Sequence, residues 1–266
     1  MGQDLRDPMM GRVDTRNTPI LALESAAAGA QSPAMDILYL DAHLVAIDKP
    51  AGLLVHRTGL DAGETRFALQ LVRDRLGRPV WPVHRLDKGT SGVLLFALDA
   101  ATAGVLGRRF EHGEGLEKTY LAMVRGWPQA DGLVDHPLAR MADDARAARL
   151  DVQEARTRFR TLAHFALPLP GQRFATTRCA RVALHPLTGR RHQLRRHMKH
   201  IAHPMLGDAT HGKGPLNRAV AALIGVQRLW LHACALTLAH PVTGAPVRIE
   251  AAPGPEWARW DAHACR

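Results

Sequence analysis

Apolar and polar residues follow patterns along the chain that predict short strands and two amphipathic helices in its first half. Apolar stretches at residues 37–40 and 44–47, divided by a polar turn, are typical of two neighbouring strands. Apolar residues at helical spacing then predict a helix that ends at Gly77. A second helix is expected to begin after Asp99, whose carboxylate can cap it, and to end near Gly113.

Strand patterns dominate the rest of the chain. Residues 93–98 are apolar without interruption, as expected of a strand that is buried on both faces. Further strands are expected at residues 119–124, 156–165, 178–184, 229–238 and 247–250. Many strands with few, separate helices predict an α+β fold.

The chain is expected to hold one folded domain between an N-terminal extension and a C-terminal tail. Residues 1–34 are rich in small, charged and proline residues without periodicity, which predicts a disordered extension. Residues 127–154 are irregular and charged, and we expect a surface insertion there. The domain itself is expected to cover residues 35–252, followed by a C-terminal tail at residues 253–266.

The composition points to a polyanionic partner. Lys and Arg total 35 against 25 Asp and Glu, so the formal net charge is +10. A surplus of this size favours nucleic acid, because each phosphate that is neutralised releases a condensed counterion. The alternative is a basic protein from a proteome rich in arginine and alanine.

Cysteine usage and hydropathy predict a cytoplasmic protein. The three cysteines, Cys179, Cys234 and Cys265, have no C-x-x-C spacing, so neither a disulfide framework nor a cysteine zinc site is expected. The first residues lack the apolar run of a secretory signal. No later apolar stretch is free enough of polar residues to span a bilayer, so we expect no membrane association.

The stretch "VHRLDKGTSG" places His84, Arg85, Asp87 and Ser91 in a loop that leads into the buried strand at residues 93–98. A carboxylate oriented there by hydroxyl and amide donors could act as a base or a nucleophile. The alternative is an ordinary turn with exposed charges. Ser91 lacks the second glycine of a G-x-S-x-G nucleophile turn, and the phosphate-loop order of residues is absent, so both of these sites are excluded.

The stretch "TGRRHQLRRHMKH" carries Arg190 and a row of cations. If its centre is helical, Arg191, Arg195 and Lys199 lie at i, i+4 and i+8 on one face, where they favour phosphates or a carboxylate. Four histidines crowd the same region: His192, His197, His200 and His203. They raise the possibility of a zinc hydrolase, but H-E-x-x-H is absent and the cations oppose a dication, so we expect no metal.

In "EKTYLAMVRGW" a strand pattern contains Tyr120, one of only two tyrosines. Such a ring is either a packing residue with a polar tip or a contact to a ligand. The ordinary frequency of half-buried tyrosines favours packing.

Taken in order, "HRLDKGTSG", "EKTY" and "LTGRRHQLRRH" resemble the pseudouridine synthases of the RluA family, and the likeness runs from about residue 36 to about residue 250. The resemblance implies an α+β catalytic domain with an extended, mainly antiparallel sheet flanked by helices and a central active-site cleft. It also implies an RNA substrate, no cofactor and no metal. No obligate protein partner is expected.

The resemblance assigns roles to individual residues. It implies that Asp87 is the nucleophile and that Arg195 pairs with it through a two-pronged contact. Tyr120 would lie against the uracil ring and is a candidate to take the C5 proton, while Arg85 would help to displace the base. The residues expected to bind RNA are His84, Arg85, Arg190, Arg191 and Lys199.

Within the family, "LLVHRTGLD", "HPMLGDATHG" and "GVQRLWLHA" resemble most the members that convert uridine 65 of tRNA. The same chemistry on ribosomal RNA is the nearest alternative, and a non-catalytic RNA-binding protein is another. Attack of Asp87 on the base and attack on the sugar carbon both stay open.

Overall fold

The computed structural model describes residues 35–56, 65–141, 151–169 and 175–265 of the chain. Residues Met35–Arg266 form one compact unit. The predicted disordered extension at residues 1–34 lies outside the described residues. Among the helices that are described, none combines the length and the apolar character needed to cross a membrane.

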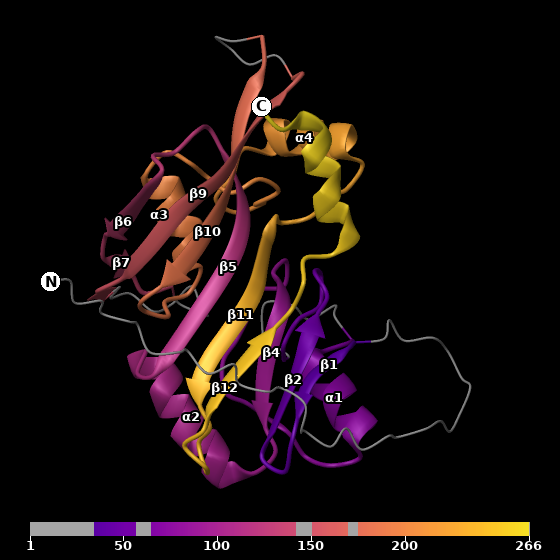
Figure 1. Ribbon diagram of the computed structural model, residues 1–266, viewed down its shortest axis with the longest axis vertical. Coiled ribbons are helices and arrows are strands. Elements are labelled where there is room, and N and C mark those ends of the chain that lie inside the picture. Colours follow the sequence, from indigo (N-terminus) through magenta and orange to yellow (C-terminus); the bar gives the residue numbers. More distant parts are fainter. Residues whose placement is uncertain (1–34, 57–64, 142–150, 170–174, 266) are drawn as a thin grey trace, which may run out of the picture. The chain divides into compact units, whose positions relative to one another are not determined.

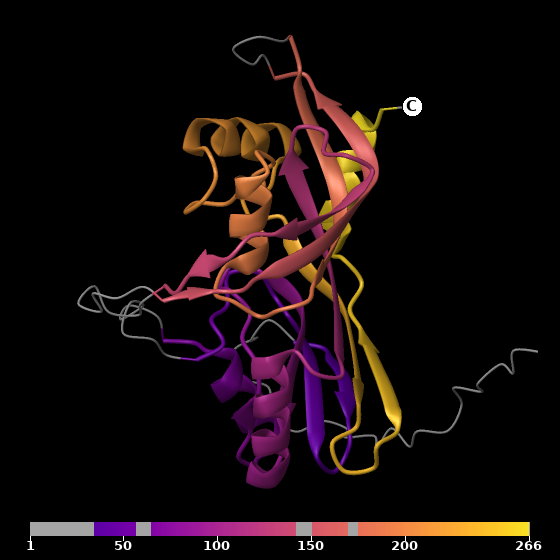
Figure 2. The same cartoon turned by 90° about the vertical axis from the view of Figure 1, so that its left-hand side faces the viewer.

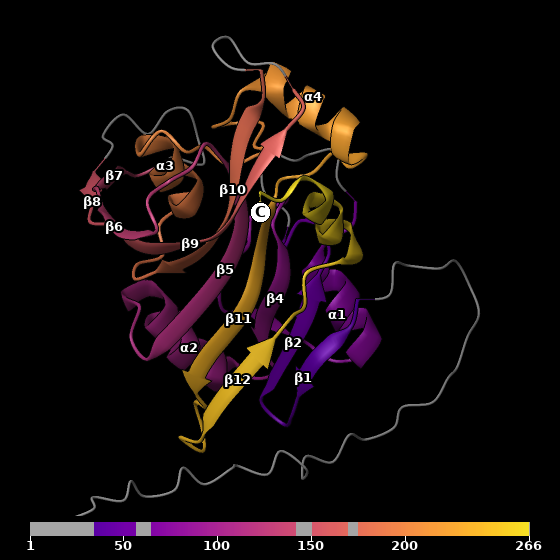
Figure 3. The same ribbon diagram turned by 45° about the horizontal axis from the view of Figure 1, so that its top comes forward.

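A ten-stranded sheet forms the centre of this unit, with the strand order β1-β2-β4-β11-β5-β10-β9-β6 (Figures 1 and 3). Its strands are β1 (Ile37–Leu40), β2 (Leu44–Lys49), β4 (Ser91–Ala97), β5 (Leu116–Arg125), β6 (Asp131–Asp135), β9 (Arg156–Leu167), β10 (Thr177–Pro186) and β11 (Leu231–Ala239), with β3 (Trp81–Pro82) beside β4 and β12 (Pro246–Glu250) beside β11. All pairs are antiparallel except β4 with β11. The predicted α+β class with a mainly antiparallel sheet is therefore confirmed.

The helices are α1 (Ala68–Leu76), α2 (Ala100–His112), α3 (Gln193–His200), α4 (Gly214–Ile224) and a 3-10 helix at Pro255–His263. The first two match the sequence pattern closely. Asp99 caps α2 by accepting a hydrogen bond from the Thr102 amide at 2.7 Å, and Gly77 and Gly113 end the two helices in the left-handed conformation. Figure 2 shows α2 and α3 on one side of the sheet and the 3-10 helix on the other.

Strand β4 is buried at every position, as its uninterrupted apolar sequence predicts. Leu94 and Phe96 pack in a cluster with Val72 of α1. Leu95 points the other way and packs in a cluster with Leu106 of α2. The strand that follows the Asp87 loop is thus held between two helices.

Two segments outside the predicted strands and helices are ordered. Residues 131–135, expected within a surface insertion, form β6, and every residue of β6 pairs with β9. The sequence "DGLVD" offers only two apolar residues, and Val134 alone is buried, so its alternation is too short to recognise. At the C-terminal end, Trp257 and Trp260 of the 3-10 helix are buried against Trp230, so this segment packs onto the body of the unit.

Candidate active site

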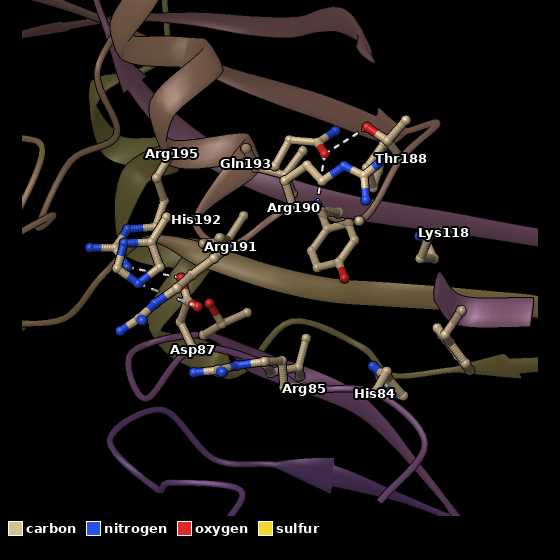
Figure 4. A pocket seen from close by; sticks show the side chains of 18 of the residues that line it. His84, Arg85, Asp87, Lys118, Thr188, Arg190, Arg191, His192, Gln193 and Arg195 are labelled. Atoms are coloured by element: carbon tan, nitrogen blue, oxygen red, sulfur yellow. Dashed lines mark hydrogen bonds and ion pairs between the residues drawn. The ribbon is translucent and has the colours of Figure 1, made fainter. Parts of the chain in front are cut away.

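A cavity of about 370 Å³ opens where the loop before β4 faces α2, β5 and the start of α3 (Figure 4). It is lined by residues 83–87, Thr90, Gly107, Phe110, Glu111, Lys118, Tyr120, Pro186, residues 188–195 and Leu231. All three sequence motifs therefore meet at one place, although more than 100 positions separate Asp87 from Arg195 along the chain.

Close backbone packing fixes the loop that carries Asp87. Gly92 has φ +104, and a Cβ there would lie only 2.2 Å from the Ala233 carbonyl oxygen, so no side chain is possible. The Lys49 ammonium, which is fully buried, donates hydrogen bonds to three carbonyls, including that of Lys88 at 3.3 Å. Gly92 thus holds the start of β4 against β11, and Lys49 ties the end of β2 to the residue beside Asp87. The sequence analysis did not single out Lys49.

Arg195 lies between two carboxylates. Its Nη1 donates to Asp87 Oδ2 at 2.8 Å, while Nε and Nη2 donate to Asp208 at 2.8 and 2.7 Å. The expected two-pronged contact is therefore made with Asp208, and the contact with Asp87 is single. Asp208 Oδ1 also accepts from the Thr210 and His211 amides.

Asp208 is a site residue that the sequence analysis missed. Its side chain has no exposed surface, and the Asn217 amide group donates to its carbonyl at 2.9 Å. The only signal in the sequence is an aspartate within a glycine-containing turn, "LGDATHG". Its pairing with Arg195 depends on the tertiary structure.

The electrostatics of this cluster favour the charged forms. Burial alone would raise the pKa of the Asp208 carboxyl, but hydrogen bonds from Arg195 and the backbone amides hold it below its usual range. Burial alone would lower the pKa of Arg195, but the two carboxylates raise it above its usual range. Arg195 is therefore a fixed cation beside Asp87.

His192 approaches Asp87 from the start of α3. It adopts the left-handed conformation, with φ 53, and its Nε2 lies 3.7 Å from Asp87 Oδ1. Its Nδ1 lies 3.0 Å from Nε2 of His211. Burial lowers the pKa of His192 to about 4, so the ring is neutral at pH 7.

The other histidines of this region point to separate partners. His197 lies 2.9 Å from the Thr157 hydroxyl, His200 stacks on His136 with ring centroids 3.6 Å apart, and His203 faces the Arg125 carbonyl at 2.8 Å. Within the described part of the chain, no group of three or more His, Cys, Asp or Glu side chains is arranged to hold a metal ion.

Tyr120 combines the two roles that the sequence left open. It packs against two apolar clusters, and it also lines the cavity. Burial, reinforced by the charge of Asp87, raises its pKa well above its usual range. The phenol is therefore protonated at neutral pH.

His84 is an uncharged ring in the wall of the cavity. It stacks on Phe110 with centroids 4.5 Å apart, and its Nε2 accepts a hydrogen bond from the Leu95 amide at 3.0 Å. Burial, with a smaller effect of Lys118, lowers its pKa to about 3. The ring is therefore uncharged at neutral pH, and a contact between His84 and RNA would not be an ion pair.

The expected row of cations along one helix face is not present. Helix α3 starts at Gln193, so Arg191 precedes it, and Arg195 is buried. Arg85, Arg190 and Arg191 line the cavity, whereas Lys199 is exposed and does not. The left-handed turn at His192 breaks the helical register that the sequence suggested.

The sequence of this chain is similar to those of known proteins. A family model described as RNA pseudouridylate synthase matches residues 43–200. The chain belongs to this family. It is 45% identical over 227 residues to tRNA pseudouridine synthase C of Vibrio cholerae, covering 84% of this chain and 93% of that protein. The protein of the same name from Pasteurella multocida is 46% identical with the same coverage.

Solved structures give the same family. Human RNA pseudouridylate synthase domain containing 1 is 26% identical and superposes with a TM-score of 0.67, covering 90% of this chain and 92% of that one. The resemblance to the pseudouridine synthases inferred from the motifs is thereby confirmed. In this RNA pseudouridylate synthase, Asp87, Tyr120 and Arg195 lie within the matched residues, and Asp208 lies beyond them.

Proposed function

We propose that this protein converts a uridine of tRNA, at position 65, to pseudouridine, and that it does so in the cytoplasm. The observation that carries the proposal is the 2.8 Å contact between Arg195 and Asp87 in a cavity lined by Tyr120. The relatives named above support tRNA as the substrate. The compact unit would be the catalytic domain.

Access to the base is the first requirement. A uridine inside a stem is hidden by stacking and pairing, so the enzyme must turn it out of the helix. Arg85 is exposed and lines the cavity two residues before Asp87 in the same loop. We assign to it the space that the base leaves, where its guanidinium can meet a phosphate or the orphaned partner base.

Asp87 is the proposed nucleophile. Arg195 holds Oδ2, while Oδ1, which lies 3.7 Å from His192 Nε2, is the oxygen that we assign to the attack. Asp208 in turn holds Arg195, so the cation orients the nucleophile without enclosing both of its oxygens.

The reaction needs no net oxidation. Asp87 attacks the pyrimidine ring or the sugar carbon, the bond between N1 and C1′ breaks, and the freed uracil turns within the cavity. C5 then bonds to C1′ and the bond to Asp87 breaks, which restores the carboxylate. The proton on C5 leaves, and N1 takes up a proton, so the reaction is an isomerisation. Tyr120 is placed against the ring, and because its pKa is raised, it meets the base as a phenol. To take the C5 proton, this phenol would first have to give up its own proton.

Binding of the RNA backbone is assigned to cations around the cavity. Arg85, Arg190 and Arg191 line it, so we propose that they contact phosphates near the target. Lys199 could reach only RNA that extends beyond the cavity. His84 would contribute by shape, since its ring is neutral.

The test is tritium release from tRNA transcripts labelled at C5 of uridine, followed by mapping of the modified position. Wild-type protein should release tritium from one site, position 65. Asp87→Asn should abolish release while tRNA binding persists, and the exposed Asp74→Asn should behave as wild type. Release from ribosomal RNA alone would refute tRNA as the substrate. No release from either RNA would refute the catalytic proposal.

A further inference from the structure

Lys118 is a cation in the cavity wall that none of the described residues neutralises. It lies on β5 and lines the cavity with His84, Phe110 and Glu111. Among the described residues, its ammonium group makes no hydrogen bond and no ion pair, and the Glu111 carboxylate does not reach it. Burial lowers the pKa of Lys118, and no carboxylate offsets this.

The space beside this ammonium group is open. A Cβ added to Gly189 would lie 3.9 Å from Lys118 Nζ, so the glycine leaves room where a side chain would stand. Both residues line the cavity. A ligand that enters the cavity can therefore approach the charge directly.

Lys118 lies away from the atoms proposed to react. Figure 4 shows Lys118 and His84 at one end of the cavity, and Asp87, His192 and Arg195 at the other. Strand alternation places Lys118 on the same face as Tyr120, two residues along β5, or about 7 Å. A nucleotide whose base lies against Tyr120 would extend its sugar and phosphate over a comparable distance.

We infer that Lys118 binds a phosphate of the RNA strand next to the displaced uridine, an inference that rests on the proposed function. The charge decides the class of ligand. A desolvated cation without a partner is stabilised most by a full negative charge, and uracil is neutral. A lysine ammonium meets phosphate as a compact point charge, without the planar fork of arginine.

The test measures the salt dependence of tRNA binding. Lys118→Met and Lys118→Arg are each combined with Asp87→Asn, so that the RNA is bound and not converted. Lys118→Met should lower the steepness of log Kd against log salt by about one. The ratio of the Kd of the Lys118→Met protein to the Kd of the Asp87→Asn protein should be about threefold smaller at roughly 200 mM salt than at roughly 50 mM salt. Lys118→Arg should keep the steepness of the Asp87→Asn protein.

Controls separate this contact from other roles. Lys213→Met removes an exposed lysine outside the cavity and should leave the salt dependence unchanged. With Asp87 intact, Lys118→Met should raise KM for tRNA by a larger factor than it lowers kcat. Its Tm should equal or exceed that of wild type, because an unpaired, partly buried charge is removed.

Three results would overturn the inference. One is an unchanged salt dependence in Lys118→Met. Another is a lower kcat at saturating tRNA with unchanged salt dependence, which would indicate contact with the base. The third is a fall in Tm for both variants, which would indicate a structural role. Failure of wild-type protein to release tritium from tRNA would instead refute the proposed function.

Discussion

The contact between Arg195 and Asp208 gives the most demanding prediction, the effect of Asp208→Asn. Both side chains are buried, with 8% and 0% of their surfaces exposed, and two hydrogen bonds of 2.8 and 2.7 Å join them. Removing one partner of a buried pair costs about 3 to 5 kcal/mol. Asparagine keeps one acceptor oxygen, so we expect a loss of about 3 kcal/mol, or roughly 10 °C in Tm.

The same substitution should impair catalysis. Asparagine offers one acceptor oxygen in place of two, so one N–H group of Arg195 loses its acceptor, and the guanidinium can turn to enclose both oxygens of Asp87. A misplacement of this kind can lower kcat by about 100-fold. Tritium release at saturating tRNA measures kcat, and thermal unfolding measures Tm.

Asp261→Asn is the matched control, because Asp261 pairs with Arg181 at 2.9 Å but is 61% exposed. Exposed pairs contribute about 1 kcal/mol at most, so its Tm should change little and its kcat should not change. If Asp208→Asn had the kcat and Tm of wild type, Asp208 would not be what holds Arg195, and the reasoning would be wrong.

The pH dependence of stability is a second test of the contact between Arg195 and Asp208. The pKa of Asp208 is lowered in the folded state, so its carboxylate stabilises the fold above its unfolded pKa of about 3.9. This contribution is lost as the pH falls through the folded pKa. Wild-type protein should therefore lose more stability than Asp208→Asn when the pH is lowered below about 4. Parallel profiles of Tm against pH would contradict this.

Four further substitutions test the packing around the cavity. Gly92→Ala would place a Cβ 2.2 Å from a backbone oxygen of β11, so we expect no folded protein, and recovery of wild-type Tm would contradict that contact. Ser91→Ala removes a hydroxyl that lies 2.8 Å from His232 Nδ1 in a buried site and should cost about 1 to 3 kcal/mol in urea unfolding. An unchanged midpoint would show that the bond contributes nothing. Gly107→Ala meets no atom within 4 Å and should stabilise α2 by about 1 kcal/mol, yet raise KM for tRNA because Gly107 lines the cavity. Gly104→Ala, outside the cavity lining, should raise Tm without changing KM, and equal KM values for both variants would count against RNA passing close to α2.

Local patterns in the sequence determined the secondary structure wherever an apolar run or a helical pattern with its cap was uninterrupted. The apolar run of residues 93–98 and the cap and glycine around α2 specified their elements, because each depends on neighbours a few positions away. The short edge strand β6 was missed for the same reason, since its pairing with β9 is a contact between distant segments. The motifs also sufficed to recognise the family.

Only the tertiary structure decided how the charges pair. The sequence placed Asp87, Tyr120 and Arg195 on three separate segments, and it suggested that Arg191 and Arg195 share a helix face. The left-handed residue His192 separates them, and Asp208 takes the two-pronged contact with Arg195. The reason is physical: a buried guanidinium needs several acceptors at fixed angles, and folding alone determines which carboxylates come within 3 Å.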